Sequence, residues 1–355
     1  MTRRRFIANL VAGIAMMGMG SAMPARASER QAVRIDNPSL REIARRRIHH
    51  GSGRFNNPFT RTSQGNPWSL IKWKLFSVNS FKSRYVSERV SPVCPDWKAI
   101  ESSALSVTFL KHSCVLIKDL NDYILIDPIF WSVSRFIKDF TPLAFDLGDM
   151  PAPRQVLVTH GHYDHLDVPT LSSLAKETHL ITPLGYDNIF DGLHMTKRTP
   201  LDWFGSFRKD GREITLLPCN HWTMRSPIEG PNRSLWGSYL IKTAAGPTIY
   251  VSGDTAYFSG FREIGEEFDI DLAIISLGAY EPRWMMAAHH LNPAETVRAF
   301  KELGARKLLV VHWGTFRLGD EPVYLPPIEL QRELEKEHLS SSFVSLDHGK
   351  TLFMT

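Results

Sequence analysis

The sequence predicts a mixed α/β fold in which helices cover β-sheets and a functional site lies on the loops along one sheet edge. The chain has 355 residues and 43% apolar content, which is enough to bury a large core. Short β-rich runs begin near residue 104 and are followed by strands that alternate with helices. Polar clusters stand at the ends of several of these runs, which is typical of a site built on loops.

The predicted elements follow from apolar periodicity and from the residues that bound each run. Strands are predicted at residues 105–110, 114–118, 123–126, 155–159, 213–217, 236–242, 248–252, 272–276 and 307–312. Pro169 suits the first turn of a helix, and Asp167 is predicted to cap that helix. A second helix is predicted at residues 293–303, where Gly304 ends it.

Residues 1–27 are predicted to be an export signal rather than part of the fold. The stretch "TRRRFI" resembles the twin-arginine pattern, an apolar run extends over residues 6–23, and Ala25-Arg26-Ala27 offers a cleavage site of small residues. The alternative is a retained membrane anchor. The glycines of the run and Asn9 favour cleavage, with a mature start near Ser28. The sequence therefore predicts an exported, periplasmic protein.

The charges divide the mature chain into a basic arm, residues 28–90, and an acidic body, residues 91–355. The arm has 13 Lys and Arg against 4 Asp and Glu, whereas the body has 25 against 33. Cations alternate with aromatic residues in the arm, as in Lys72-Trp73-Lys74. This mixture suits peripheral contact with an anionic membrane, and the alternative is an arm that wraps the acidic body. Nucleic-acid binding is disfavoured, because no nucleic-acid-reading motif is present and an exported protein would rarely meet nucleic acid.

Three cysteines, Cys94, Cys114 and Cys219, are too few for a disulfide framework. No C-x-x-C spacing for zinc or redox chemistry occurs. One disulfide could form in an oxidising compartment, but we interpret all three as core residues.

A metal centre is predicted from the stretch "THGHYDHLD" at residues 159–167, which follows an apolar strand. A loop that leaves a strand can turn His160, His162, Asp164 and His165 toward one point, and imidazole with carboxylate suits zinc-like cations. Three further residues also stand at the ends of predicted strands, namely His221, Asp254 and His312. Each alone would be an ordinary polar turn residue, but with the cluster they indicate the remaining ligands.

These residues resemble the signature of the metallo-β-lactamase superfamily. The H-x-H-x-D-H motif matches residues 160–165, and the other signature positions match, in chain order, Asp127, His221, Asp254 and His312. The resemblance implies a four-layer αββα sandwich with two divalent metal ions, zinc being the first choice. The stretches "RFNNP", "PCNHW", "HLNPAE" and "HWGTF" further resemble the N-acylphosphatidylethanolamine-hydrolysing phospholipase D family.

The resemblance also implies a role for each matched residue. One metal is expected to be bound by His160, His162 and His221, and the other by Asp164, His165 and His312. Asp254 should bridge the two metals, and Asp127 should accept an N–H from a ligand histidine. Direct catalytic roles are expected for Asp164, as a ligand, and for His290, as a donor to a phosphate oxygen or to the leaving alkoxide.

The implied activity is hydrolysis of N-acylphosphatidylethanolamine, by a hydroxide that bridges the metals, to an N-acylethanolamine and phosphatidic acid. A phospholipid would then be the substrate. One alternative is a metal-dependent hydrolase of another bond, such as a lactone or an amide. Another is a binding protein that keeps the metals without turnover. Oligomeric state stays open, with a homodimer among the alternatives.

Overall fold

The structure is a computed structural model that describes residues 38–60, 67–226 and 228–354. The predicted export signal at residues 1–27 lies outside the described residues. Within the described ranges, no helix has both the length and the apolar character needed to cross a membrane.

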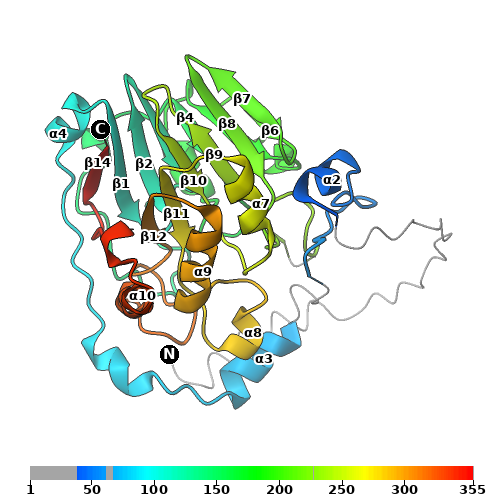
Figure 1. The fold of residues 1–355 in the computed structure, drawn as a ribbon, viewed down its shortest axis with the longest axis vertical. Coiled ribbons are helices and arrows are strands. Elements are labelled where there is room, and N and C mark those ends of the chain that lie inside the picture. The colour runs from blue at the N-terminus through cyan, green and yellow to red at the C-terminus, as the bar shows by residue number, and fades with distance from the viewer. Residues whose placement is uncertain (1–37, 61–66, 227, 355) are drawn as a thin grey trace.

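Two seven-stranded sheets form the centre of the fold (Figure 1). The first sheet runs, from edge to edge, through β14 (Thr351–Met354), β1 (Leu105–Lys111), β2 (Cys114–Asp119), β3 (Asp122–Ile126), β4 (Gln155–Leu157), β5 (His179–Pro183) and β6 (Arg198–Leu201). The second sheet runs through β13 (Phe343–Val344), β12 (Lys307–Val311), β11 (Leu272–Ser276), β10 (Thr248–Val251), β9 (Ser238–Lys242), β8 (Arg212–Leu217) and β7 (Ser206–Lys209). Both sheets mix parallel and antiparallel pairs.

Helices complete the mixed α/β architecture. The α-helices are α2 (Leu40–Arg45), α3 (Pro67–Phe76), α4 (Trp97–Ser102), α5 (Val168–Ser173), α6 (Asp187–Phe190), α7 (Gly260–Glu267), α8 (Arg283–Met286), α9 (Pro293–Leu303) and α10 (Leu325–Lys336). The described residues also form three short 3₁₀ helices, Lys82–Ser87, Leu147–Asp149 and Ser340–Ser342. Helices α7, α9 and α10 pack together beside the second sheet, whereas α5 and α6 contribute to a separate core on the first sheet.

The hydrophobic core explains why the strands read as nearly continuous apolar runs. Alternate residues of β1 to β3 face the second sheet and join one large buried cluster, which also takes in α7 and α9. The opposite faces of the same strands, including Leu116 and Leu125, belong to the smaller cluster with Leu171 of α5. Both faces of the first sheet are therefore buried, which removes the alternation expected of a half-exposed strand.

All nine predicted strands and both predicted helices are present, with ends that differ by at most a few residues. Helix α9 begins with a capping box in which Asn292 and Glu295 bond reciprocally, and Gly304 ends it with φ 62°. Asp167 caps α5 by accepting a hydrogen bond from the Thr170 N–H. Five strands, β5, β6, β7, β13 and β14, were not predicted, and all of them except β5 are the short edge strands of the two sheets.

The prediction that all three cysteines lie in the core is wrong for Cys94. Cys114 and Cys219 are buried, but Cys94 is exposed in the segment that precedes α4, and all three are free thiols. The apolar neighbours of Cys94 in sequence gave no sign that this segment follows the surface.

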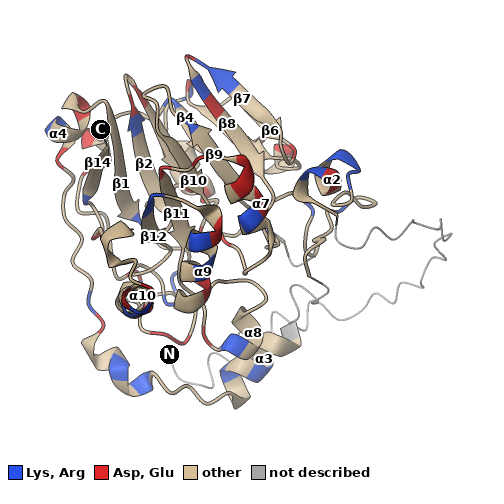
Figure 2. Cartoon of the chain, viewed as in Figure 1, with Lys and Arg blue, Asp and Glu red and all other residues tan. Residues whose placement is uncertain are grey.

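The described part of the basic arm packs along the body. Arg41 of α2 forms an ion pair with Glu267 at the end of α7, and Figure 2 shows basic residues on α2 beside acidic residues on α7. Lys72 of α3 lies over the ring of Trp284 in α8, with 4.7 Å from Nζ to the ring centroid. Figure 1 shows α3 next to α8. Cation–π and ionic contacts of this kind fasten the arm to the body.

A buried ion pair ties together the ends of the two sheets. The Asp119 carboxylate at the end of β2 accepts a hydrogen bond from Arg212 Nε, at 2.6 Å, at the start of β8. It also accepts from the N–H groups of Ala244 and Ala245. Both charged side chains are almost fully buried, at 0% and 3% exposure. Hydrogen bonds therefore compensate the cost of desolvating this carboxylate.

We predict that Asp119→Ala lowers the free energy of unfolding by about 3–5 kcal/mol, because the substitution leaves the buried Arg212 guanidinium with the longer contact to Asp122 Oδ2, at 3.4 Å, as its carboxylate partner. Urea denaturation monitored by circular dichroism measures the change. The control is Glu333→Ala, which removes the more exposed pair with Lys336 and should cost less than about 1 kcal/mol. Equal losses for the two variants would contradict the prediction.

Candidate metal centre

The polar residues that follow the central strands meet at one edge of the two sheets. Asp127 follows β3, and the segment 159–165 follows β4, in the first sheet. His221, Asp254 and His312 follow β8, β10 and β12 in the second sheet. Because the two sheets pack face to face, these strand ends bring ligands from both sheets to the same place.

The predicted ligands form two adjacent groups. In the first group, His162 Nδ1 lies 2.9 Å from His160 Nε2 and 3.3 Å from His221 Nε2. In the second group, Asp164 Oδ2 lies 3.6 Å from His165 Nε2 and 3.4 Å from His312 Nε2. The members of each group are close enough for one cation to bind them together.

Asp254 lies between the two groups. Its Oδ2 atom is 3.2 Å from the Nε2 atoms of both His165 and His312 in the second group. The same oxygen is 4.0 Å from the Nε2 atoms of His160 and His221 in the first group. A carboxylate in this position can supply an oxygen ligand to a cation held by either group.

Asp127 fixes the orientation of the His165 ring by bonding to Nδ1, the ring nitrogen that does not face the other ligands. Its Oδ2 lies 2.7 Å from His165 Nδ1, and its two oxygens also accept from the N–H and hydroxyl of Thr159. The pairing places the His165 proton on Nδ1 and turns Nε2 toward Asp254, which is the arrangement that ligand histidines need.

His112 is a member of the site that the sequence analysis missed. It lies in the turn between β1 and β2, it is fully buried, and its Nε2 is 3.0 Å from Asp164 Oδ2. Its ring also lies 4.2 Å from the ring of His312. The same signal that indicated His221 and His312, a histidine directly after a predicted strand, could have found it.

The backbone around the site adopts unusual conformations. His112, Asp127 and His312 have φ values of 50°, 43° and 69°, a region that side chains other than glycine rarely occupy. Gly278 packs so closely that a Cβ atom would lie 2.0 Å from the His312 carbonyl oxygen. Backbone strain at three residues of one site is typical of functional sites, where the surrounding fold imposes the geometry.

Burial and neighbouring charges shift the pKa values of the site histidines in opposite directions. Burial lowers the pKa of His162 to about 4, and it lowers those of His160 and His221 well below the usual value. Burial would also lower the pKa of His312, but Asp254 and Asp164 outweigh it and raise this pKa to about 9. Their effect raises the pKa of His165 as well. In return, the two histidines hold the pKa of Asp254 far below its usual value despite its burial.

The residues present fit divalent cations. Asp254 Oδ1 and the Nε2 atoms of His165 and His312 are buried, and none of them makes a hydrogen bond within the described part of the chain. Buried polar atoms without partners are costly, so a cation that accepts their lone pairs would relieve that cost. A His-rich set with carboxylates suits zinc and related ions.

His290 lies at the open side of the cluster, after α8. Its Nδ1 is 3.8 Å from Asp254 Oδ2, and its side chain is 16% exposed. Burial lowers the pKa of His290 to about 3. The neighbouring His289 faces Trp222 instead, with 5.7 Å between ring centroids. Of the two histidines, His290 is the one that faces the predicted ligands.

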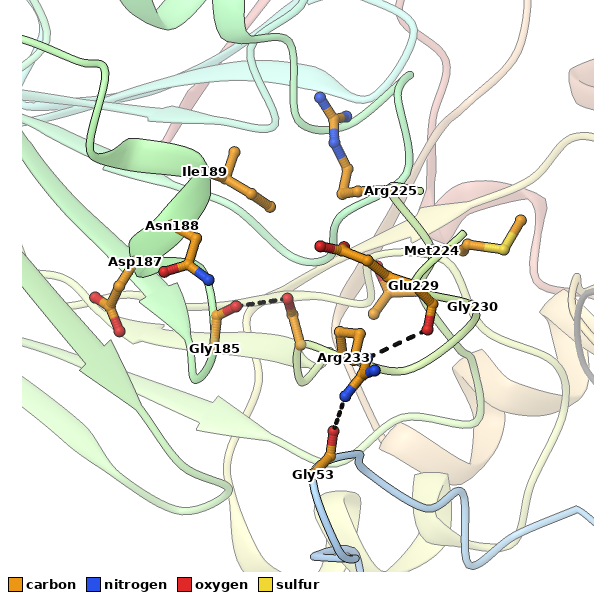
Figure 3. Close-up of a pocket in the computed structure, with 12 residues that line it drawn as sticks. Gly53, Gly185, Asp187, Asn188, Ile189, Met224, Arg225, Glu229, Gly230 and Arg233 are labelled. Atoms are coloured by element: carbon orange, nitrogen blue, oxygen red, sulfur yellow. Dashed lines mark hydrogen bonds between the residues drawn. The ribbon is translucent and has the colours of Figure 1, made fainter. Parts of the chain in front are cut away.

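A separate cavity of about 520 Å³ lies behind the metal-binding loop (Figure 3). Thr223 at its wall accepts a hydrogen bond from the Gly161 N–H, between His160 and His162. Figure 3 shows Arg233 reaching the carbonyl of Gly53, which brings the arm to the rim of the cavity. None of the predicted metal ligands lines this cavity.

Comparisons with known proteins place this arrangement of strands and ligands in a family. The Beta-lactamase superfamily domain matches residues 122–313, a range that contains every predicted ligand. An N-acyl-phosphatidylethanolamine-hydrolyzing phospholipase D from Caenorhabditis elegans is 34% identical over 70% of this chain and 75% of its own length. The chain belongs to the metallo-β-lactamase superfamily, in its N-acylphosphatidylethanolamine phospholipase D-like family.

Two further comparisons extend the likeness within the superfamily. An uncharacterized protein from Mycobacterium tuberculosis is 30% identical over 93% of this chain and 92% of its own length. Igni18, a metallo hydrolase from Ignicoccus hospitalis, has a TM-score of 0.53 at 19% identity, over 70% of this chain and 97% of its own. The metallo-β-lactamase fold is thus confirmed, and the protein is a metal-dependent hydrolase with a His and Asp cluster able to bind metal.

We predict that Asp254→Asn lowers the number of metal ions bound per chain, because the amide has no negative charge to offset the cations that both ligand groups would hold. Elemental analysis of the purified variant after gel filtration measures the metal content. The control is Asp167→Asn in the adjacent motif, which caps α5 and should keep full metal content. Full metal content in Asp254→Asn would show that this carboxylate does not bind metal.

Proposed function

We propose that this protein is a phospholipase D-type phosphodiesterase that binds two zinc ions and hydrolyses N-acylphosphatidylethanolamine to an N-acylethanolamine and phosphatidic acid. The observation that carries the proposal is the position of Asp254, within 4.0 Å of histidines from both ligand groups. The similarity to the Caenorhabditis elegans enzyme supports the choice of substrate.

The side chains of the site have distinct tasks in this reaction. His160, His162 and His221 would hold one zinc ion, and Asp164, His165 and His312 the other, with Asp254 between them. When bound, two such cations lower the pKa of water and offset the negative charge that develops on the phosphoryl oxygens. Asp127 keeps the His165 proton on Nδ1, so that its Nε2 stays available as a ligand.

His290 would bind the phosphate directly. It stands on the open side of the cluster, and its backbone is held by Arg283, whose Nη1 donates to the His290 carbonyl at 3.0 Å. Arg283 is itself held by Glu295 of α9, so the position of His290 is fixed by two elements. From there the imidazole can donate an N–H to a non-bridging phosphoryl oxygen and stabilise its growing charge.

The surface next to His290 has the composition of a membrane-binding face, which supports peripheral contact with an anionic bilayer. Trp284 of α8, only six residues before His290, is 48% exposed. The arm beside it exposes Phe76 at 76% and Val78 at 93%, and Lys82 is also exposed. An apolar group flanked by cations can insert into the interface while the cations meet anionic head groups. A lipid could then pass from the bilayer toward His290.

Export completes the proposed function. The twin-arginine-like stretch at residues 1–27 supports action in the periplasm, where the outer leaflet of the inner membrane would supply the phospholipid.

We predict that the zinc-loaded protein releases N-acylethanolamine from N-acylphosphatidylethanolamine vesicles and, when the reaction runs in ¹⁸O-water, places the label in phosphatidic acid, because the attack is on phosphorus. Mass spectrometry of both products measures this. His290→Ala should lower kcat by about 100-fold, since it removes one donor to the transition state. His289→Ala is the matched comparison and should have a much smaller effect.

A panel of lactones and β-lactams tests the alternative bond types with the same preparation. Turnover of these compounds, with none of the phospholipid, would overturn the proposed activity.

We predict that Phe76→Ser weakens binding to anionic vesicles, because the variant loses an apolar group that would enter the interface. Flotation with phosphatidylglycerol vesicles measures binding, with phosphatidylcholine vesicles as the neutral reference. The matched control is Phe353→Ser on β14, where the phenylalanine is 48% exposed on a strand at the edge of the first sheet. An equal loss of binding in both variants would count against a specific membrane face.

A further inference from the structure

A second group of metal-ligand side chains lies at the junction of the arm and the body. His49 and His50 are adjacent in the arm, and Asp202 follows β6 in the body. His49 Nε2 is 2.6 Å from Asp202 Oδ1, and His50 Nε2 is 2.8 Å from Asp202 Oδ2. Two imidazole nitrogens and one carboxylate, from segments about 150 residues apart, thus converge on one point.

The geometry of this group matches that of the candidate metal centre. The rings of His49 and His50 lie 4.4 Å apart with an interplanar angle of 70°. In the metal centre, His160 and His162 lie 4.6 Å apart at 86°. The two imidazole pairs thus have similar spacing and a similar steep angle between their rings, and in each pair the nitrogens are close enough to bind one cation.

The ring of His49 is fixed by its surroundings. It is fully buried and stacks on Trp203, with 4.2 Å between ring centroids and an interplanar angle of 19°. The side chains of His50 and Asp202 are 26% and 29% exposed, which leaves an approach from solvent. A cation could therefore enter, and water could complete its coordination.

We propose that His49, His50 and Asp202 form a third metal site, structural rather than catalytic, that binds a zinc-like divalent cation and fastens the arm to the body. The donor set of two neutral imidazoles and one carboxylate suits such an ion. In a tetrahedral site with bonds of about 2.0–2.2 Å, ligand atoms lie roughly 3.3 Å apart, so the His50 nitrogen would move by about 0.5 Å and the His49 nitrogen by about 0.7 Å from the carboxylate.

The site would affect the metal centre through the arm. Asn57, seven residues after His50, donates from Nδ2 to the His221 carbonyl at 2.8 Å and to Asn220 Oδ1 at 2.9 Å. A cation that holds His50 to Asp202 would therefore keep Asn57 against the segment that carries His221. Structural metal ions stabilise folded proteins in this way, because the unfolded chain has no preformed site.

The experiment compares the zinc content of the wild-type protein with that of Asp202→Asn. The asparagine can still accept from one histidine and donate to the other, so it retains the hydrogen-bonded junction but loses the charge that a cation needs. After saturation with zinc and gel filtration, elemental analysis should show one zinc ion fewer per chain in the variant. The matched control, Asp191→Asn at an exposed carboxylate, should retain the wild-type content.

Limited trypsin digestion provides a second readout that is independent of activity. Zinc should slow cleavage at Arg45, Arg46, Arg47 and Arg54 in the wild-type protein but not in Asp202→Asn. If that variant is misfolded by circular dichroism, His50→Gln, at a partly exposed position, takes its place. Equal zinc contents in wild type and variant would overturn the third site, even if the catalytic centre holds two ions, and would leave a hydrogen-bonded junction as the only role of these residues.

Discussion

Two carboxylates, Asp164 and Asp254, impose the arrangement of the candidate metal centre. Asp254 is almost fully buried and Asp164 is largely so, at 2% and 14% exposure, and a negative charge in such a place is tolerated only where positive charge or hydrogen-bond donors surround it. In this protein the surrounding groups are histidines, which raises the pKa values of His165 and His312 and lowers those of the carboxylates. Divalent cations would supply that positive charge in place of the protons, because metal ligands bind in their deprotonated forms.

The two sheets make this concentration of polar groups possible. A chain can leave a buried sheet at the end of a strand, because the backbone N–H and C=O groups of the strand itself keep their hydrogen bonds. The clusters between and around the sheets are apolar, and the predicted metal ligands are gathered at one edge. The backbone at His112, Asp127 and His312 adopts unfavourable φ values there, and the rigid strands on either side supply the constraint that maintains them.

The arm joins the site to the periphery of the molecule. It contacts the body through His49 and His50 at Asp202, through Asn57 at His221, and through Lys72 at Trp284. The last contact lies beside the segment that carries His290. The arm therefore borders both the metal ligands and the exposed aromatic surface.

The kinds of ligand, their order along the chain and the strands that precede them could all be predicted from the amino-acid sequence. These features depend on local patterns, such as apolar runs that end in His or Asp and the capping residues Asp167, Asn292 and Gly304. The folded chain was needed to show that His112 meets Asp164, that His165 is the ligand histidine bonded to Asp127, and that the His49–His50 pair meets Asp202. Those contacts join residues that are distant in the chain. No local sequence pattern identifies a partner that only the packing of the fold brings close.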